Sequence, residues 1–225
     1  MSGVAAVAER SLLSRRVRDD RIRMDESKSW MAIVAENPDH SRWYIERFRS
    51  MAAAGHDLHG EARLIDAMVS RDARILDAGC GPGRVGGRLH ELGHDVVGID
   101  IDPTLIAAAE EDNPGPRWIV GDLATVDVRS ASVEPGFDVI VAAGNVMTFV
   151  ETATRRPVLA NLAGMLAADG RLVVGFGAGR GYEFDDFDAD ATSAGLHFDL
   201  RLGTWDLRPW TPESDFLVAV LRGEG

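Results

Sequence analysis

The chain has 225 residues, of which 45% are hydrophobic and 27% are charged. This length is typical of one domain whose core is large enough to fold without disulfides, and the single cysteine, Cys80, excludes an intramolecular disulfide or a cysteine-rich zinc site. The formal net charge of −12 disfavours nucleic acids and anionic membranes as partners, and no apolar run is long enough to span a bilayer. We therefore expect a cytoplasmic protein of one domain.

Residues 1–40 are predicted to form an N-terminal tail that is partly flexible. The first 24 residues carry six arginines against three acidic residues. Such a stretch is typical of a solvated tail, with an arm that binds a partner as the alternative. Met24 opens the sequence Asp-Glu-Ser-Lys, and the sequence leaves open whether Met1 or Met24 is the true start.

Two helices are predicted after the tail, and strands then alternate with helices. Residues 41–54 and 58–69 carry apolar side chains near the 3.6-residue helical period. Strands are predicted at 73–77, 95–99, 117–120, 137–142 and 171–176, with helices at 84–92, 103–112 and 155–168. Asp102 is predicted to cap the second of these helices, and Asp169-Gly170 to end the third. The alternation indicates a parallel sheet with helices on both faces.

The C-terminal part departs from this alternation. A helix is predicted at 183–194, followed by strands at 196–205 and 216–221, with Phe198, Leu200 and Leu202 on one face. Two strands joined without a helix pair antiparallel, so the sheet should end in a hairpin. We predict one domain over residues 41–225, with N-terminal helices at 41–72 and a core at 73–225.

The segment Asp77-Ala-Gly-Cys-Gly-Pro-Gly83 follows the first predicted strand. Its three glycines allow a tight turn and the close approach of a ligand. A Gly-x-Gly-x-x-Gly pattern ending at Gly86 also matches the dinucleotide fingerprint, so a nicotinamide-dependent oxidoreductase is an alternative. Pro82 lacks an N–H for a phosphate, and the Asp77 carboxylate would repel one while suiting an ammonium or a sulfonium. Lys28 is the only lysine, and the chain has no Tyr-x-x-x-Lys pair.

Two further acids end the next two predicted strands. Asp100 follows Val96-Val-Gly-Ile, and Asp122 follows Trp118-Ile-Val-Gly. The carboxyl ends of parallel strands lie at one edge of a sheet, so Asp100 can accept hydrogen bonds from both hydroxyls of a ribose. Asp122 can accept one from the exocyclic amine of an adenine packed between Ile101 and Leu123. Taken singly, each acid could instead cap a helix or lie in a solvated loop.

Together these segments resemble the class I S-adenosylmethionine-dependent methyltransferases. The resemblance rests on Asp77–Gly83, Gly98-Ile-Asp100, Gly121-Asp122-Leu123 and the terminal hairpin, and it covers residues 73–221. It implies an α/β fold in three αβα layers, Rossmann-like and doubly wound, with seven mostly parallel strands and a reversed last strand. It also implies S-adenosylmethionine as the cofactor, a cofactor-binding core at 73–225, and a lid or substrate role for the helices at 41–72.

The resemblance further implies which residues contact the cofactor. They lie in the glycine loop, at the strand-end acids and after the fourth strand: Asp77, Gly79, Cys80, Gly81, Gly83, Arg84, Asp100, Ile101, Asp122, Leu123, Gly144 and Asn145. Arg84 is alternatively a surface residue of the first helical turn, and Asn145 a cap of the turn. No catalytic residue is assigned, because methyl transfer from a sulfonium depends mainly on alignment. No metal site is predicted.

The acceptor is expected to be a small molecule. The chain lacks the Asn/Asp-Pro-Pro-aromatic signature that nucleic-acid amino-methyltransferases carry after the fourth strand. Residues that could contact the acceptor, each with a core or surface role as the alternative, are Trp43, Tyr44, His56, His59, Met147, Phe149, Tyr182, Trp205 and Trp210. A non-catalytic, S-adenosylmethionine-binding regulatory protein remains a further alternative. A monomer or homodimer is expected.

Overall fold

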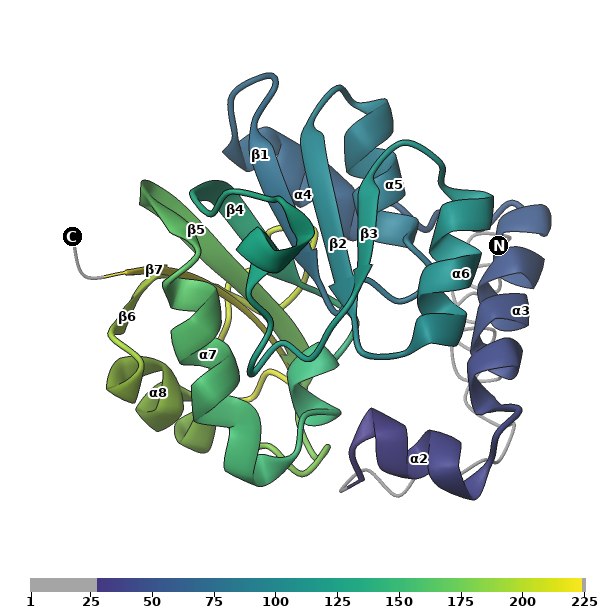
Figure 1. Cartoon of the computed structure of the whole chain (residues 1–225). Helices are drawn as coiled ribbons and strands as arrows, with labels where there is room; N and C mark the ends of the chain where they lie inside the picture. The colour runs from purple at the N-terminus through teal and green to yellow at the C-terminus, as the bar shows by residue number, and fades with distance from the viewer. Residues whose placement is uncertain (1–27, 224–225) are drawn as a thin grey trace, which may run out of the picture.

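The computed structural model of the chain describes residues 28–223 (Figure 1). The predicted alternative start at Met24 and residues 1–27 of the predicted tail lie outside this range. The helices are α2 (Trp30–Glu36), α3 (His40–Ala53), α4 (Gly60–Met68), α5 (Arg84–Glu91), α6 (Pro103–Asp112), α7 (Arg155–Ala163) and α8 (Phe184–Ser193), with 3₁₀ turns η1 (Val128–Ala131), η2 (Val146–Thr148) and η3 (Thr152–Thr154). The strands are β1 (Arg74–Ala78), β2 (Asp95–Asp100), β3 (Arg117–Val120), β4 (Phe137–Ala142), β5 (Leu166–Gly177), β6 (Leu196–Leu202) and β7 (Phe216–Gly223).

The strands form one seven-stranded sheet in the order β3-β2-β1-β4-β5-β7-β6. The first five strands pair in parallel, whereas β7 pairs antiparallel with both β5 and β6. The direction in which successive strands are added reverses between β1 and β4: β2 and β3 lie on one side of β1, and β4 and β5 lie on the other. The predicted Rossmann-like sheet with its reversed last strand and terminal hairpin is therefore confirmed.

Helices cover both faces of this sheet (Figure 1). On the face of α7 and α8, a cluster of buried residues joins Leu159 and Phe187 to the strand residues Ile140 and Leu172. On the opposite face, a second cluster packs α4 and α5 against other strand residues, among them Val139. Because side chains alternate along a strand, the central strands carry apolar residues toward both layers. The three-layer prediction follows from that pattern.

The boundary between α7 and β5 differs from the prediction. The helix ends at Ala163 rather than residue 168, and β5 begins at Leu166, which pairs with Phe137 of β4. Gly170 lies inside β5 and does not have the left-handed backbone of a helix stop. The predicted cap at Asp102 is confirmed, since its Oδ1 accepts a hydrogen bond of 2.8 Å from the Thr104 N–H.

The prediction that Phe198, Leu200 and Leu202 lie on one face of strand β6 is wrong. A β-bulge shifts the pairing with β7 between Phe198 and Leu200. Phe198 therefore packs against the cluster of α7 and α8, whereas Leu202 belongs to the cluster of α4 and α5. Leu200 is 47% exposed on this edge strand. The inserted residue reverses the direction of the side chains that follow it.

Helix α2 lies within the segment predicted as a tail. It occupies residues 30–36, and its Trp30 is buried. In Figure 1 it lies on the side of the sheet where the parallel strands end. Within residues 28–223, every helix is too short or too polar to cross a membrane.

Candidate functional site

One cavity lies at the carboxyl edge of the parallel strands. The loops after β1, β2, β3 and β4 contribute to it, together with α2, α3 and the start of α7. Its lining residues are Ser29, Trp30, Met31, Tyr44, Gly79, Gly81, Asp100, Ile101, Leu105, Asp122, Leu123, Ala143, Gly144, Val146, Phe149, Val150, Glu151, Thr154 and Val158. The apolar and aromatic side chains among them surround a few carboxylates and hydroxyls, a composition typical of a small-molecule site.

The loop between β1 and α5 brings the backbone to this cavity. Gly79 and Gly81 line it, and both have the left-handed backbone that glycine favours, with φ of +75° and +55°. A β-carbon at Gly79 would lie 2.5 Å from the side chain of Val146. The glycine thus allows the loop after β1 to approach the loop after β4, and the main chain forms part of the cavity wall.

Asp100 and Asp122 line the cavity at the ends of β2 and β3. Two backbone groups orient the Asp100 side chain: its Oδ2 accepts a hydrogen bond of 2.8 Å from the Gly81 N–H, and its Oδ1 accepts one of 2.9 Å from the Asp102 N–H. Asp122 is more exposed, and its Oδ1 accepts one from the Ala124 N–H. Each carboxylate keeps lone pairs that can accept further hydrogen bonds.

The third predicted acid, Asp77, lies behind the glycine loop and does not line the cavity. It is 2% exposed, and its Oδ2 accepts a hydrogen bond of 2.8 Å from the Gly86 N–H at the start of α5. Burial raises the pKa of Asp77 to about 7 and that of Asp100 to about 6, although backbone hydrogen bonds oppose both shifts. A positively charged ligand nearby would favour the ionised form of these carboxyls.

Seven of the twelve residues predicted to bind the cofactor therefore line the cavity: Gly79, Gly81, Asp100, Ile101, Asp122, Leu123 and Gly144. Of the other five, Asp77 is described above. The structure therefore brings the strand-end residues together with Gly79 and Gly81, the first two of the loop's three glycines. Which of them contact the cofactor remains a prediction.

Arg84 and Asn145 have partners elsewhere in the protein. The Arg84 guanidinium donates two hydrogen bonds to the Glu61 carboxylate, at 2.6 and 2.8 Å, and a third to the Leu58 carbonyl. This ion pair ties the end of the glycine loop to α4 and differs from the exposed role given as the alternative. The Asn145 Oδ1 accepts a hydrogen bond of 2.9 Å from the Gly177 N–H and so joins the loop after β4 to the end of β5.

Cys80 and Gly83 also serve the loop itself. Cys80 is buried with its Sγ 3.7 Å from the Gly81 carbonyl, and burial raises the pKa of its thiol. This thiol therefore stays protonated near neutral pH. A β-carbon at Gly83 would lie 3.0 Å from both Ala109 and Trp118, so this glycine permits close packing of the loop.

Three cavity residues, Ser29, Trp30 and Met31, come from α2 and its approach, which the sequence analysis missed. The available signal was the apolar run from Trp30 to Ala35, followed by Pro38. Of the residues suggested for the acceptor, only Tyr44 and Phe149 line the cavity. His56 and His59 are exposed outside it. Within residues 28–223, no cluster of three or more histidine, cysteine or acidic side chains could hold a metal ion.

Comparison with known proteins adds independent information. A family model described as a methyltransferase domain matches residues 75–170. A solved structure, a TehB-like SAM-dependent methyltransferase from Corynebacterium glutamicum, is 53% identical with a TM-score of 0.79, and the alignment covers 84% of this chain and 100% of that one.

More distant relatives agree. An uncharacterized methyltransferase from Mycobacterium tuberculosis is 31% identical over 121 residues, which are 52% of this chain and 57% of that protein. The chain thus aligns with little more than half the length of this relative. Magnesium protoporphyrin IX methyltransferase from Synechocystis, solved with bound SAM, is similar in fold, with a TM-score of 0.60 at 17% identity over 91% of this chain and 100% of that one.

Proposed function

The chain belongs to the class I S-adenosylmethionine-dependent methyltransferase family, and we propose that it transfers a methyl group to a small-molecule acceptor. When bound, S-adenosylmethionine supplies a methyl group on a positively charged sulfur, which transfers by in-line displacement. One observation carries the proposal: a single cavity combines a glycine loop, two strand-end carboxylates and the apolar pair Ile101 and Leu123.

These residues fit the chemical groups of the cofactor. Asp100, buried and held by two backbone N–H groups, would accept hydrogen bonds from the ribose hydroxyls. Asp122 would accept one from the adenine amine, with Ile101 and Leu123 on either side of the ring. Ile101 is apolar yet 39% exposed, and a bound ring would cover it. Gly79 and Gly81 would leave room for the amino-acid part.

Asp77 and Arg84, which were predicted to bind the cofactor but lie outside the cavity, would act on the cofactor through the residues that they hold in place. Asp77 holds the start of α5 through Gly86, and the Arg84–Glu61 pair fixes the same helix to α4. They would keep the glycine loop in the conformation that the cofactor requires. We place them in positioning roles, which a loss of cofactor affinity on substitution would reveal.

The aromatic side chains of the cavity support a small acceptor. Trp30, Tyr44 and Phe149 line it beside the glycine loop and would exclude water from the reacting atoms. Burial raises the pKa of Tyr44, so its hydroxyl stays protonated at neutral pH and is available as a hydrogen-bond donor. The net charge of −12 supports an acceptor other than nucleic acid. The single cysteine, which gives the chain no intramolecular disulfide, supports the proposed cytoplasmic location.

Cofactor binding is tested first. S-adenosylhomocysteine, the product form, is expected to raise the unfolding temperature, whereas NAD and NADP should leave it unchanged; the reverse result would overturn the proposal. Asp100→Ala should weaken binding by about 2–3 kcal/mol in calorimetry, because two ribose hydroxyls lose their partner. Asp127→Ala, an exposed aspartate that caps η1, serves as the matched control.

Catalysis and the acceptor are tested next. The protein is incubated with a metabolite extract and S-adenosylmethionine carrying an isotopically labelled methyl group. Labelled small molecules and S-adenosylhomocysteine should form together. Cofactor binding without either product would favour the non-catalytic alternative, and label found only in nucleic acid would contradict the small-molecule acceptor.

A further inference from the structure

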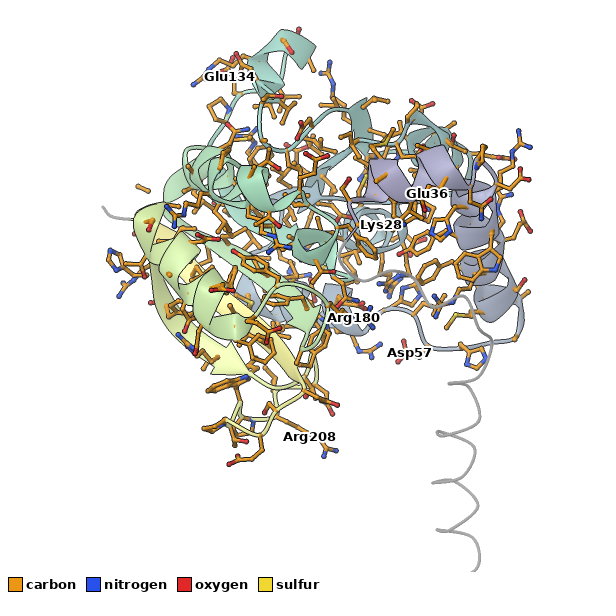
Figure 2. All side chains as sticks on the ribbon, turned by 90° about the horizontal axis from the view of Figure 1, so that it is seen from below. Lys28, Glu36, Asp57, Glu134, Arg180 and Arg208 are labelled. Atoms are coloured by element: carbon orange, nitrogen blue, oxygen red, sulfur yellow. The ribbon has the colours of Figure 1, made fainter. Side chains whose placement is uncertain are left out.

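Helix α2 is held by its buried Trp30 and, more weakly, by the partly buried Val34, which packs against the cluster that contains Trp30. The helix has seven residues, and Trp30 is the one that is buried, while Met31 is 41% exposed. Figure 2, which views the molecule from the side of the cavity, shows Lys28 and Glu36 near each other at the two ends of this segment; their ion pair of 2.9 Å closes the segment on itself. A helix this short has little stability of its own, so its place depends on the contacts of Trp30.

Trp30 connects two sides of the cavity. Its indole N–H donates a hydrogen bond of 2.8 Å to the Asp102 Oδ2 in the loop after β2, and its backbone N–H donates one of 3.1 Å to the Phe149 carbonyl in the loop after β4. The indole also meets the Tyr44 and Phe149 rings edge-on, with centroids 5.2 and 5.7 Å away. The helix thus spans the cavity from one strand-end loop to the other.

Asp102 divides its two oxygens between two tasks. Its Oδ1 caps α6 through the Thr104 N–H, and its Oδ2 accepts hydrogen bonds from the Trp30 indole and the Ser41 hydroxyl at the start of α3. Its own N–H donates to the Asp100 carboxylate, which lines the cavity. Asp102 is 2% exposed. One buried residue therefore contacts α2, α3, α6 and the carboxylate assigned to the ribose.

We propose that Asp102 is a positioning residue that latches Trp30 and α2 over the cofactor site, and that release of this latch controls cofactor exchange. The inference rests on the proposed function, because it assumes that the cavity holds S-adenosylmethionine. Residues 37–39, between α2 and α3, include Pro38 and provide the pivot. Breaking the contacts of Trp30 would free the helix while leaving α3 packed against α6.

The two oxygens of Asp102 permit a selective test. Asp102→Asn keeps an Oδ1 that can cap α6 but places an amide, which donates and does not accept, against the Trp30 indole N–H. The Ser41 hydroxyl can turn to accept a hydrogen bond from this amide, so the contact with α3 is retained. Trp30→Phe keeps an aromatic ring but removes the indole N–H together with the five-membered ring that carries it. Asp127→Asn is the matched control, because Asp127 also caps a short helix, η1, through its Oδ1, and its partners Arg129 and Ser130 lie in that helix.

The main measurement is the dissociation rate of radiolabelled S-adenosylmethionine from the full-length protein, chased with excess S-adenosylhomocysteine. We expect both variants to release it about tenfold faster, the effect of losing one hydrogen bond to a charged group. The double variant should be no faster than Asp102→Asn alone, since both changes break the same latch. Amide hydrogen exchange should increase in residues 30–36 while residues 103–112 keep their protection.

Any other outcome would contradict the proposed latch. Unchanged dissociation rates in both variants would contradict it, as would faster exchange in 103–112 without a selective change in 30–36, which would assign Asp102 to the stability of α6 alone. If the unmodified protein binds neither compound, the proposed function itself fails. Binding by the unmodified protein together with unchanged rates in the variants refutes only the latch.

Discussion

At Gly79, backbone conformation and packing both exclude a side chain. Its φ is +75°, and a β-carbon would lie 2.5 Å from Val146. We expect Gly79→Ala to lower the free energy of unfolding by more than the roughly 1–3 kcal/mol of backbone strain alone, and to abolish S-adenosylhomocysteine binding. Gly93→Ala is the control, because Gly93 has φ of +94° with no atom within 4 Å of the added carbon. Equal losses of stability in urea denaturation would contradict the steric argument.

Asp77 makes the stability of the ligand-free protein depend on pH. Its pKa is about 7 in the fold and 3.8 as an ordinary value, so the folded state binds the proton more tightly between these limits. The free energy of unfolding should therefore fall as pH rises from about 4 to about 7. Asp77→Asn keeps an acceptor for the Gly86 N–H and removes the titration, so the variant should be the more stable above pH 7, by at most about 4 kcal/mol.

Urea denaturation across this pH range, without ligand, measures the effect. Asp100 remains in the variant with a pKa of about 6, so a smaller slope between about pH 4 and pH 6 should persist. Parallel profiles for the variant and the unmodified protein would contradict the prediction, because they would mean that Asp77 has the same pKa in the folded and the unfolded state.

At the scale of elements, the bulge in β6 separates two leucines that simple alternation groups together. Leu202 is 5% exposed and Leu200 is 47% exposed. We expect Leu202→Ala to lower the free energy of unfolding by about 2–4 kcal/mol, through lost burial and a cavity. Leu200→Ala should change it by about 0.5 kcal/mol or less. Chemical denaturation of both variants decides, and similar losses would refute the observed register.

The elements that the sequence predicts well have strong local signals. The bounds of β3, β4 and α6 agree with the prediction because the apolar runs of the two strands end before Gly121 and Gly144, and α6 begins after its cap, Asp102. The predicted end of α7 at residue 168 is wrong. Leu162, Met165 and Leu166 continue a helical spacing, but the pairing of Leu166 with Phe137 of β4 outweighs this local preference. The spacing of residues along the chain does not show which distant strand a segment will pair with.

The residues of the cavity also fall into those that the sequence could locate and those that it could not. The strand-end acids Asp100 and Asp122 could be located because parallel strands end at one edge of a sheet. The role of Trp30 could not, because its partner Asp102 lies 72 residues away and the hydrogen bond depends on how the chain before the sheet folds back. Likewise, nothing near Arg84 identifies Glu61 as its partner, 23 residues earlier.

At the scale of the whole molecule, the net charge of −12 opposes the compact state through self-repulsion. Raising sodium chloride from about 0.01 to about 0.15 M shortens the screening length from about 30 to about 8 Å. Exposed pairs such as Arg49–Asp112, at 2.9 Å, are weakened too, but each contributes little. We therefore expect the unfolding temperature at pH 7 to rise by about 2–4 °C, equivalent to about 1 kcal/mol.

Calorimetry across the salt series measures this shift. Repeating the series near the sequence pI of about 4.9 provides the control, because the repulsion is then absent and the salt effect should vanish. A fall in the unfolding temperature with salt at pH 7 would mean that the attractive pairs outweigh the net repulsion. In that case the acidic surface would be organised into stabilising networks, and Arg49, which contacts Glu46, Glu111 and Asp112, would be the first residue to substitute.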